Sequence, residues 1–244
     1  MVIGKHHIQP VLLYLPDEEK WLKEFEEAKA YFAAQGLTDI ECIAGIHAHK
    51  WGVTGTHIYL LDGRPEEQFQ IGQSKTGGFL SHYLLYNVMK YMPVGPRVTG
   101  TGVNGANTRM SMLNEEDIFM VLEGDCRFTT VNWKEILADA LNALPANWDF
   151  LFIGSCCALN KEPVPVAGDV YHYPWRGAEK WDWYPQGGWC YLVKRRCMDL
   201  LIKTQRDAGV PVDISLIRYA FPEMKVYAIL PRLADQGSKT LVIP

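Results

Sequence analysis

The chain has 244 residues, of which 48% are hydrophobic and 21% charged, a composition that excludes a disordered protein and suits one large α/β domain or two small lobes. Its net charge of −4 argues against a broad nucleic-acid-binding face, although a local basic groove is compatible with it. No apolar run is long enough for a transmembrane helix, and the first residues lack the apolar core of a signal peptide. The six cysteines show no C-x-x-C spacing, so we expect a reduced, soluble, cytoplasmic protein.

The first forty residues predict a β-α-β unit. Residues 11–15 form an apolar run typical of a strand, and residues 18–34 place apolar side chains at helical spacing, with Asp17 as the expected N-cap. Gly36 ends this helix, and residues 40–43 predict a second strand. This order of elements begins a nucleotide-binding type of fold.

A weaker pattern follows before the centre of the chain. Residues 77–91 predict a helix that two glycines open, and the N-terminus of such a helix can hold a phosphate or a sugar hydroxyl. Residues 100–105 match G-x-G-x-x-G, but no strand precedes them, so we interpret them as a glycine loop that could act as an active-site lid.

The most informative stretch is an apolar strand that runs into two acids. Residues 118–122 are uninterrupted apolar residues, as in a strand covered on both faces, and Glu123-Gly124-Asp125 follows directly. Two carboxylates that flank a glycine can share one hard cation, and the missing side chain lets a phosphate approach the backbone. The alternative is an ordinary surface turn, since glycine and aspartate are common turn residues.

The second half of the chain continues the alternation of strands and helices. Strands are predicted at 148–154, 189–193 and 224–230, and helices at 133–144 (with Asn132 as cap), 194–204 and 214–219. Residues 155–187 read as a long loop rich in tyrosine and tryptophan, whose rings either stack on sugars or bases or simply pin the loop to the core.

Six short motifs occur in an order that resembles the family 25 glycosyltransferases, which include lipooligosaccharide and collagen-hydroxylysine galactosyltransferases. The resemblance covers most of residues 8–240. The matching pieces are Gly77-Gly78-Phe79-Leu80-Ser81-His82, Val121-Leu122-Glu123-Gly124-Asp125, Trp148-Asp149-Phe150, Gly188 to Val193, Pro211-Val212-Asp213, and Pro231 to Gln236.

The resemblance implies an α/β fold of the GT-A type. We expect a single Rossmann-like domain over residues 1–244, with a mixed, mostly parallel central sheet flanked by helices. Residues 1–130 would be the nucleotide-sugar-binding half and residues 131–244 the acceptor-side half. The implied activity is metal-dependent transfer of a hexose, glucose or galactose, from a UDP-linked donor to a hydroxyl acceptor with inversion, assisted by Mn²⁺ or Mg²⁺.

The resemblance also implies roles for particular residues. Asp125 would be the direct metal ligand and Glu123 would assist it. Asp213 is the candidate for the base that takes the acceptor proton, with Asp182 and Asp235 as rivals, although Asp213 could instead cap the helix that follows it. The expected donor-binding residues are Tyr14, Gly45, Ser81, His82, Glu123, Gly124 and Asp125. The expected acceptor-binding residues are Trp181, Trp183, Gln186, Gly187 and Gly188.

Three features depart from the family pattern. Gly124 stands where relatives carry the central acid of Glu-Asp-Asp, which removes one carboxylate. The first strand ends Tyr14-Leu15-Pro16-Asp17 without the family's arginine, which leaves the nucleotide base open. Residues 91–116 have no counterpart and would form a lid of their own.

Several alternatives remain at this point. The acceptor is a glycan by family default, but it could be a protein hydroxyl or a hydroxylated DNA base such as 5-hydroxymethylcytosine, given the aromatic loop and the basic run Lys194-Arg195-Arg196. A nucleotidyltransferase shares the strand-then-acid arrangement. The loss of one acid at Gly124 also makes a non-catalytic sugar-nucleotide-binding module credible.

Overall fold

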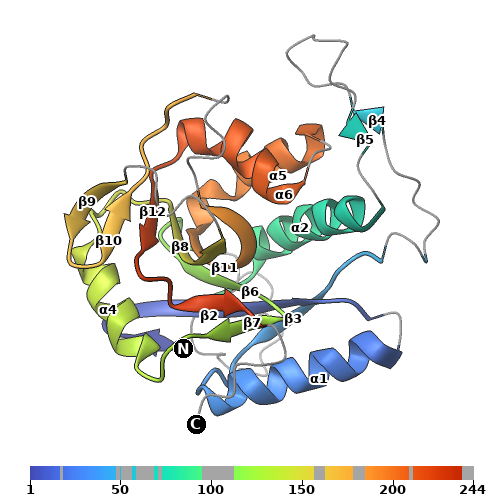
Figure 1. Ribbon diagram of the computed structural model, residues 1–244, viewed down its shortest axis with the longest axis horizontal. Helices are drawn as coiled ribbons and strands as arrows, with labels where there is room; N and C mark the ends of the chain where they lie inside the picture. Colours follow the sequence, from blue (N-terminus) through green and yellow to red (C-terminus); the bar gives the residue numbers. More distant parts are fainter. Residues whose placement is uncertain are drawn as a thin grey trace, which may run out of the picture.

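The computed structural model (Figure 1) describes residues 1–16, 19–47, 50, 57–58, 69–70, 73–94, 113–156, 163–177, 185–208 and 211–237. Among these, the strands form one large twisted sheet, apart from a separate pair of two-residue strands. That pair consists of β4 (His57–Ile58) and β5 (Phe69–Gln70).

The centre of the large sheet is mixed but mostly parallel, as the sequence predicts. Its six central strands lie in the order β3 (Glu41–Ala44), β2 (His6–Tyr14), β6 (Ile118–Glu123), β11 (Gln186–Lys194), β8 (Phe150–Cys156) and β12 (Val226–Ile229). Only β11 runs against the others in this row of described strands. The parallel strands therefore end at one common edge.

Shorter strands extend the sheet on both sides. β1 (Val2–Ile3) pairs with β2, while β10 (Val170–His172) and β9 (Val164–Ala167) lie beyond β12. A further pair, β7 (Cys126–Phe128) and β13 (Ala234–Gln236), joins the sheet where Ala234 meets Gly154 of β8. These strands are not predicted from the sequence, because two to four residues are too few to show an alternating pattern.

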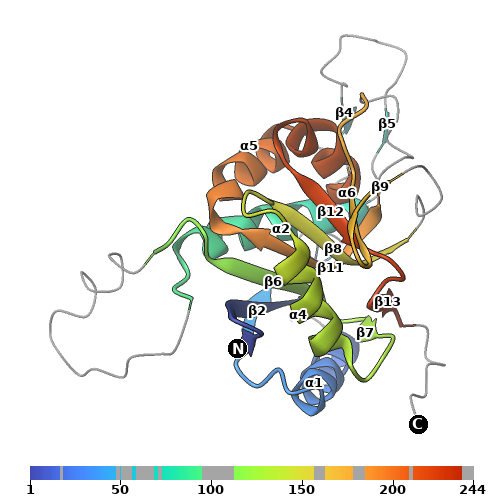
Figure 2. The same cartoon turned by 90° about the vertical axis from the view of Figure 1, so that its left-hand side faces the viewer.

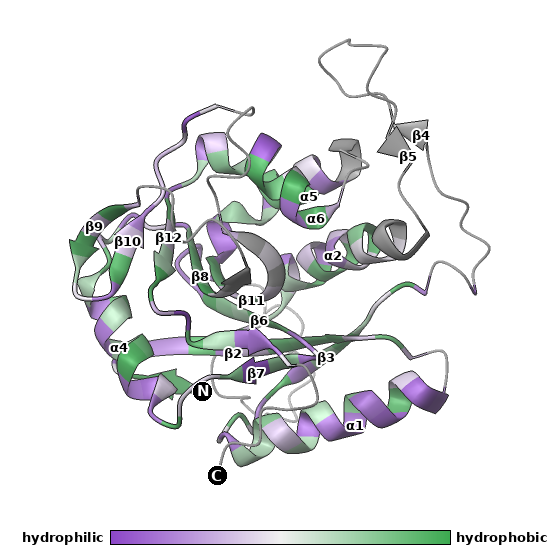
Figure 3. Cartoon of the chain, in the orientation of Figure 1, coloured by the Kyte–Doolittle hydropathy of each residue, from purple (hydrophilic) through white to green (hydrophobic). Residues whose placement is uncertain are grey.

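Helices cover both faces of the sheet (Figures 1 and 2). One face carries α1 (Glu19–Ala34) and α4 (Trp133–Ala143). The other carries α2 (Gln73–Tyr91), α5 (Met198–Ala208), α6 (Val212–Ser215) and the π-helical turn η3 (Leu216–Ala220), with two short 3₁₀ turns, η2 (Arg195–Cys197) and η4 (Phe221–Glu223). Each face buries its own hydrophobic core, and Figure 3 shows mostly hydrophobic central strands beside helices that carry both hydrophobic and hydrophilic residues.

The predicted β-α-β opening is confirmed. β2 and β3 are parallel neighbours with Val11 opposite Glu41, and α1 connects them. α1 buries Ala28 and Phe32, two of the residues that the helical spacing placed on its inner face. Gly36 has a φ of 76°, a left-handed conformation that glycine adopts without strain and that ends the helix. The proposed cap, Asp17, lies outside the described residues.

Three local predictions were wrong in detail. The helix predicted to open at two glycines begins at Gln73, so Gly77 and Gly78 lie inside α2 and not at its N-terminus. The helix expected from residue 194 begins only at Met198, because residues 195–197 form the 3₁₀ turn η2. Asn132 does stand at the N-cap of α4, but its side chain gives no capping hydrogen bond and accepts one from the Thr130 hydroxyl instead. A side-chain partner outside the helix can outcompete the cap, which the sequence pattern does not reveal.

The described helices include none that is both long and apolar enough to cross a membrane. Cys126, Cys190 and Cys197 are free thiols buried in the protein, as expected for cysteine used as a small hydrophobe, and Cys42 is free and exposed.

Candidate active site at the carboxyl edge of the sheet

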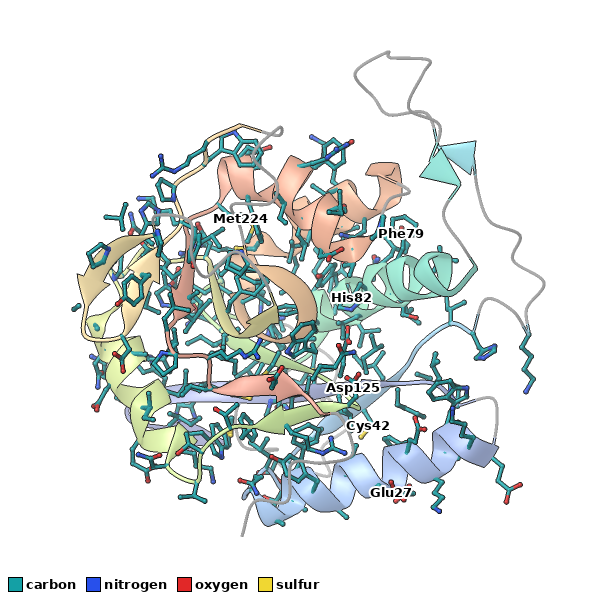
Figure 4. All side chains as sticks on the ribbon, viewed as in Figure 1. Glu27, Cys42, Phe79, His82, Asp125 and Met224 are labelled. Atoms are coloured by element: carbon teal, nitrogen blue, oxygen red, sulfur yellow. The ribbon has the colours of Figure 1, made fainter. Side chains whose placement is uncertain are left out.

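The carboxyl ends of β2, β3 and β6 meet at one edge of the sheet. Leu13 lies opposite Glu123 in the β2–β6 pair, and Tyr14 lies opposite Ala44 in the β2–β3 pair. Ligands of open α/β sheets bind at such an edge. Figure 4 shows His82 on α2 and Asp125 beyond the end of β6, both toward this side of the molecule.

Gly45 and Ser81 join α2 to this edge. The Gly45 N–H donates to the Tyr14 carbonyl oxygen at 2.6 Å, and the Ile46 N–H donates to Ser81 Oγ at 2.7 Å. A Cβ at Gly45 would lie 2.8 Å from Ser81 Oγ, so a side chain there would displace the serine. Ser81 also donates to the Gly77 carbonyl oxygen at 2.6 Å, so its only proton is already used within the protein. The Ser81 hydroxyl therefore connects α2 to the sheet edge through hydrogen bonds. Contact of Ser81 with a nucleotide-sugar stays a prediction.

His82 links the next turn of α2 to the first acid. Its side chain is 1% exposed, and its Nε2 lies 3.3 Å from Oε1 of Glu123, whose side chain is 32% exposed. The carboxylate therefore has one oxygen held by a buried ring while the side chain as a whole still reaches solvent.

Two tyrosines that the sequence analysis did not single out continue this contact inward. Tyr191 Oη lies 3.3 Å from His82 Nδ1, and Tyr86 Oη lies 2.9 Å from Tyr191 Oη. Both tyrosines are fully buried, and burial raises the pKa of each hydroxyl well above its ordinary value, so both stay protonated at neutral pH. Tyr86 stands four residues after His82, a spacing that places both on one helix face and could have revealed it. No pattern in the neighbouring sequence links Tyr191 to His82 or Tyr86, which lie 109 and 105 residues away in the chain.

Asp125 lies in the turn between β6 and β7, so the alternative prediction of a turn is confirmed, while metal binding at Glu123 and Asp125 stays a prediction. This turn is anchored by the end of the chain's last described strand. Gln236 Nε2 donates to Asp125 Oδ2 at 2.7 Å, and the Gly237 N–H donates to the Asp125 carbonyl oxygen at 2.7 Å. The second carboxylate oxygen, Oδ1, is buried and has no hydrogen-bond partner in the described structure.

The Asp125 carboxyl group is poorly stabilised as an anion. Burial raises its pKa, the negative charge of Glu123 raises it further, and the hydrogen bond from Gln236 opposes both effects only in part. A cation at this position would remove the repulsion and give the buried oxygen a partner, which is the chemical character of a metal-binding carboxylate.

The donor set suits Mn²⁺ or Mg²⁺, which prefer oxygen ligands, but it is small. The described residues hold no group of three or more His, Cys, Asp or Glu side chains placed to bind a metal. Such cations are commonly held by one or two carboxylates, with phosphate oxygens and water completing the shell. Glu123 and Asp125 fit that pattern. Gly124 between them has open space where a side chain would stand.

The acceptor-side predictions fall mostly outside the described structure. Trp181, Trp183 and the rival base Asp182 lie outside the described residues, as does the side chain of Gln186. Gly187 has a φ of 86°, and a Cβ there would lie 2.0 Å from the Trp189 ring, so this glycine makes room for a buried tryptophan. Gly188 is part of β11. Contact of these residues with an acceptor stays a prediction.

The segment predicted as an aromatic loop folds in part as β9 and β10, and three of its described aromatic residues pack inward. Tyr173 is 4% exposed in the hydrophobic core on the face of the sheet that carries α2. Tyr171 and Trp175 are partly buried against the same core. For these three residues the interpretation as a cluster that pins the loop is correct.

The candidate bases occupy different surroundings. Asp213 lies in the first turn of α6, where its Oδ1 accepts the Ile214 N–H at 2.9 Å; the N-cap itself is Pro211. α6 packs beside α2 and β11, which places it on the same face as His82. Asp235 is paired with Arg232 at 2.7 Å.

The basic run Lys194-Arg195-Arg196 is no surface for nucleic-acid phosphates, and this interpretation was wrong. Lys194 and Arg195 are each 4% exposed, and all three side chains form ion pairs within the protein. Their partners are Glu116, Asp117 and Asp149. Acidic residues far away in the chain neutralise these basic side chains, and the sequence around residues 194–196 gives no sign of that pairing.

Comparisons with known proteins give little. No protein-family model matches the chain, and no curated protein matches it. Among solved structures it is similar to a glycosyltransferase involved in the glycosylation of the major capsid of PBCV-1, at 10% identity and a TM-score of 0.44, covering 96% of this chain and 94% of that one. It is also similar to mannose-1-phosphate geranyltransferase from Thermus thermophilus, at 10% identity and a TM-score of 0.45, covering 94% of this chain and 76% of that one. At this level of similarity neither structure bears on what the chain does.

Proposed function

We propose that the protein is a divalent-cation-dependent glycosyltransferase that moves a hexose from a nucleotide-sugar to a hydroxyl acceptor. The observation that supports this most is Asp125. Its carboxylate follows the central parallel strand β6, keeps one buried oxygen without a described partner, and stands beside a second acid, Glu123.

In this proposal Asp125 binds the cation directly and Glu123 assists. A bound cation supplies positive charge that stabilises the diphosphate as it leaves the sugar. Gly124 leaves room for the phosphates next to the backbone. The donor is a UDP-hexose, with glucose or galactose as the sugar and Tyr14 and Gly45 on the donor side of the edge.

The acceptor side is assigned to the face that carries α6. Asp213 takes the proton of the acceptor hydroxyl, and the sugar is transferred with inversion. The acceptor is a glycan. A DNA acceptor loses one of its two supports, because all three side chains of the basic run form ion pairs within the protein.

The test is a thermal-shift screen of UDP-glucose and UDP-galactose with and without Mn²⁺, followed by transfer assays on hits. A ligand at a hundred times its Kd stabilises the wild type by about 2.7 kcal/mol. Asp125→Asn should abolish the shift that depends on Mn²⁺ together with the donor. Asp199→Asn is the matched control, because Asp199 is an acid with a side chain that is 77% exposed on α5.

Other outcomes would contradict the proposal in distinguishable ways. Pyrophosphate release from a nucleoside triphosphate and a sugar phosphate would indicate a nucleotidyltransferase. Donor binding without turnover on any acceptor would indicate a binding module. An unchanged Mn²⁺ response in Asp125→Asn would remove Asp125 from the site.

A further inference from the structure

We propose that Tyr191 and Tyr86 are positioning residues that fix the tautomer of His82 and thereby hold the Glu123 carboxylate in place for its cation. The inference rests on the proposed function and extends it to two residues in the core. Neither tyrosine lies within hydrogen-bond distance of the carboxylate, so both act through the histidine.

The direction of this hydrogen-bond chain follows from its end. An ionised carboxylate can only accept, so His82 Nε2 must carry the proton that it shares with Glu123. In a neutral ring Nδ1 then has no proton and accepts from the Tyr191 hydroxyl. Tyr191 in turn accepts from Tyr86. The Tyr86 hydroxyl, the Tyr191 hydroxyl and His82 Nε2 thus each donate to one acceptor, and the direction of each hydrogen bond is set by its neighbour.

The reverse direction leaves a proton without a partner. If His82 carried protons on both nitrogens, Tyr191 would accept from Nδ1 and donate to Tyr86. The Tyr86 hydroxyl has no second partner among the described residues, and it is fully buried. Every donor in these hydrogen bonds has an acceptor among the described residues only when the His82 proton that faces Glu123 is on Nε2 and Nδ1 accepts from Tyr191.

Packing holds the chain in this geometry. The Tyr191 ring stacks on Phe150 with centroids 4.6 Å apart and lies 6.4 Å from the His82 ring, nearly parallel to it. His82 and Tyr86 share one face of α2, and Tyr191 faces them from the middle of β11. The histidine ring therefore cannot rotate without breaking contacts on two sides.

The consequence falls on Glu123. Oε1 is held by His82, which fixes the plane of the carboxylate and leaves the other oxygen for a cation. Outer partners that orient a metal ligand in this way typically change metal affinity about 10- to 100-fold when they are removed.

The direct test is ¹⁵N NMR of the His82 ring together with Mn²⁺ binding. The wild type should show His82 protonated on Nε2 alone. Tyr191→Phe should lose this single tautomer and raise the Mn²⁺ concentration at half saturation by about 10-fold, with a smaller rise in Tyr86→Phe. Tyr173→Phe is the matched control, because the Tyr173 hydroxyl is buried on the same face without a described partner.

Two histidine variants separate positioning from packing. In His82→Gln the side-chain nitrogen takes the place of Nε2 and can still donate to Glu123, whereas in His82→Asn it takes the place of Nδ1 and cannot. The glutamine variant should therefore lose less Mn²⁺ affinity than the asparagine variant. If His82 had only a packing role, the two variants would lose Mn²⁺ affinity to the same extent.

The failures are distinguishable. If Tyr191→Phe keeps both the His82 tautomer and the Mn²⁺ affinity of the wild type, this inference is overturned and the proposed function stands. If the wild type binds no Mn²⁺ even with a UDP-sugar present, the proposed function is overturned, and with it the role assigned to the tyrosines. Urea midpoints of both Tyr→Phe variants close to that of the wild type exclude general unfolding as the cause.

Discussion

At the scale of single residues, Asp125 combines a proposed function with a cost in stability. Its raised pKa means that the folded protein holds the proton more tightly than the unfolded chain. This contribution to stability is present below the ordinary pKa of an aspartate and is lost as the pH rises through the folded-state value. At neutral pH, the metal-free protein therefore carries an unfavourable anion.

Asp125→Asn should accordingly stabilise the metal-free protein. The amide keeps an oxygen for Gln236 and removes the buried charge, but its nitrogen takes the place of the unpartnered Oδ1, so we expect a net gain of less than about 1 kcal/mol at pH 7. The gain should shrink as the pH is lowered toward 4. Urea denaturation in the presence of EDTA at several pH values measures this; an equal or lower stability at pH 7 would contradict it.

Gly124 allows the opposite change. Its Cβ position is open and its backbone has no left-handed φ, so a side chain fits without strain. Gly124→Asp should leave the free energy of unfolding within about 0.5 kcal/mol when Mn²⁺ is present and should lower the Mn²⁺ Kd several-fold. Gly124→Asn has the same shape without the charge and should leave the Kd unchanged. Calorimetric titration with Mn²⁺ compares the two.

At the scale of elements, β13 is the support of the acid turn. It pairs with β7, and just beyond it Gly237 packs against Asp125 so closely that a Cβ would lie 3.0 Å from the Asp125 carbonyl oxygen and 2.7 Å from Arg127 Cγ. The position of Asp125 therefore depends on a strand that is 111 residues away in the chain.

Gly237→Ala should disturb this junction. Overpacking of a tight contact costs about 1–3 kcal/mol, and we expect Mn²⁺ affinity to fall with it because the turn must shift. Gly78→Ala is the matched control. Its Cβ would stand in open space on α2, where alanine is favoured over glycine by about 0.5–1 kcal/mol. Denaturant midpoints should move in opposite directions for the two variants.

At the scale of the whole molecule, Arg195 joins α2 to the start of β6. Its guanidinium donates to the carbonyl oxygens of Met89, Lys90 and Met92 near the end of α2 and pairs with Asp117 at 2.7 Å. The residue is 4% exposed. Arg195 therefore connects α2, which carries His82, to the residue that precedes β6, the strand that ends at Glu123.

Arg195→Ala should destabilise the protein by about 3–5 kcal/mol, since it leaves a mostly buried Asp117 and several carbonyl groups without a partner. The surface pair of Lys90 and Asp199 offers a contrast, and Lys90→Ala should leave the urea midpoint nearly unchanged. A small effect of Arg195→Ala on the urea midpoint would contradict this structural role of Arg195.

The sequence alone determined the elements whose signal is local. The apolar runs at residues 11–15 and 118–122 predicted buried strands, and helical spacing between residues 18 and 34 predicted α1, because burial repeats with the period of the element. In the structure, Tyr14, Gly45 and Glu123 come at or just after the ends of parallel strands, so they meet at one edge of the sheet, where the resemblance led us to expect donor-binding residues.

Only the tertiary structure decided which side chains meet. Tyr191 reaches His82 across 109 residues, Gln236 reaches Asp125 across 111, and Arg195 reaches Asp117 across 78. Such contacts leave no periodic trace in the chain, because a hydrogen bond or ion pair depends on the geometry of two segments and not on the residues next to either. For this reason the run at 194–196 read as a basic surface and folds as a buried clamp.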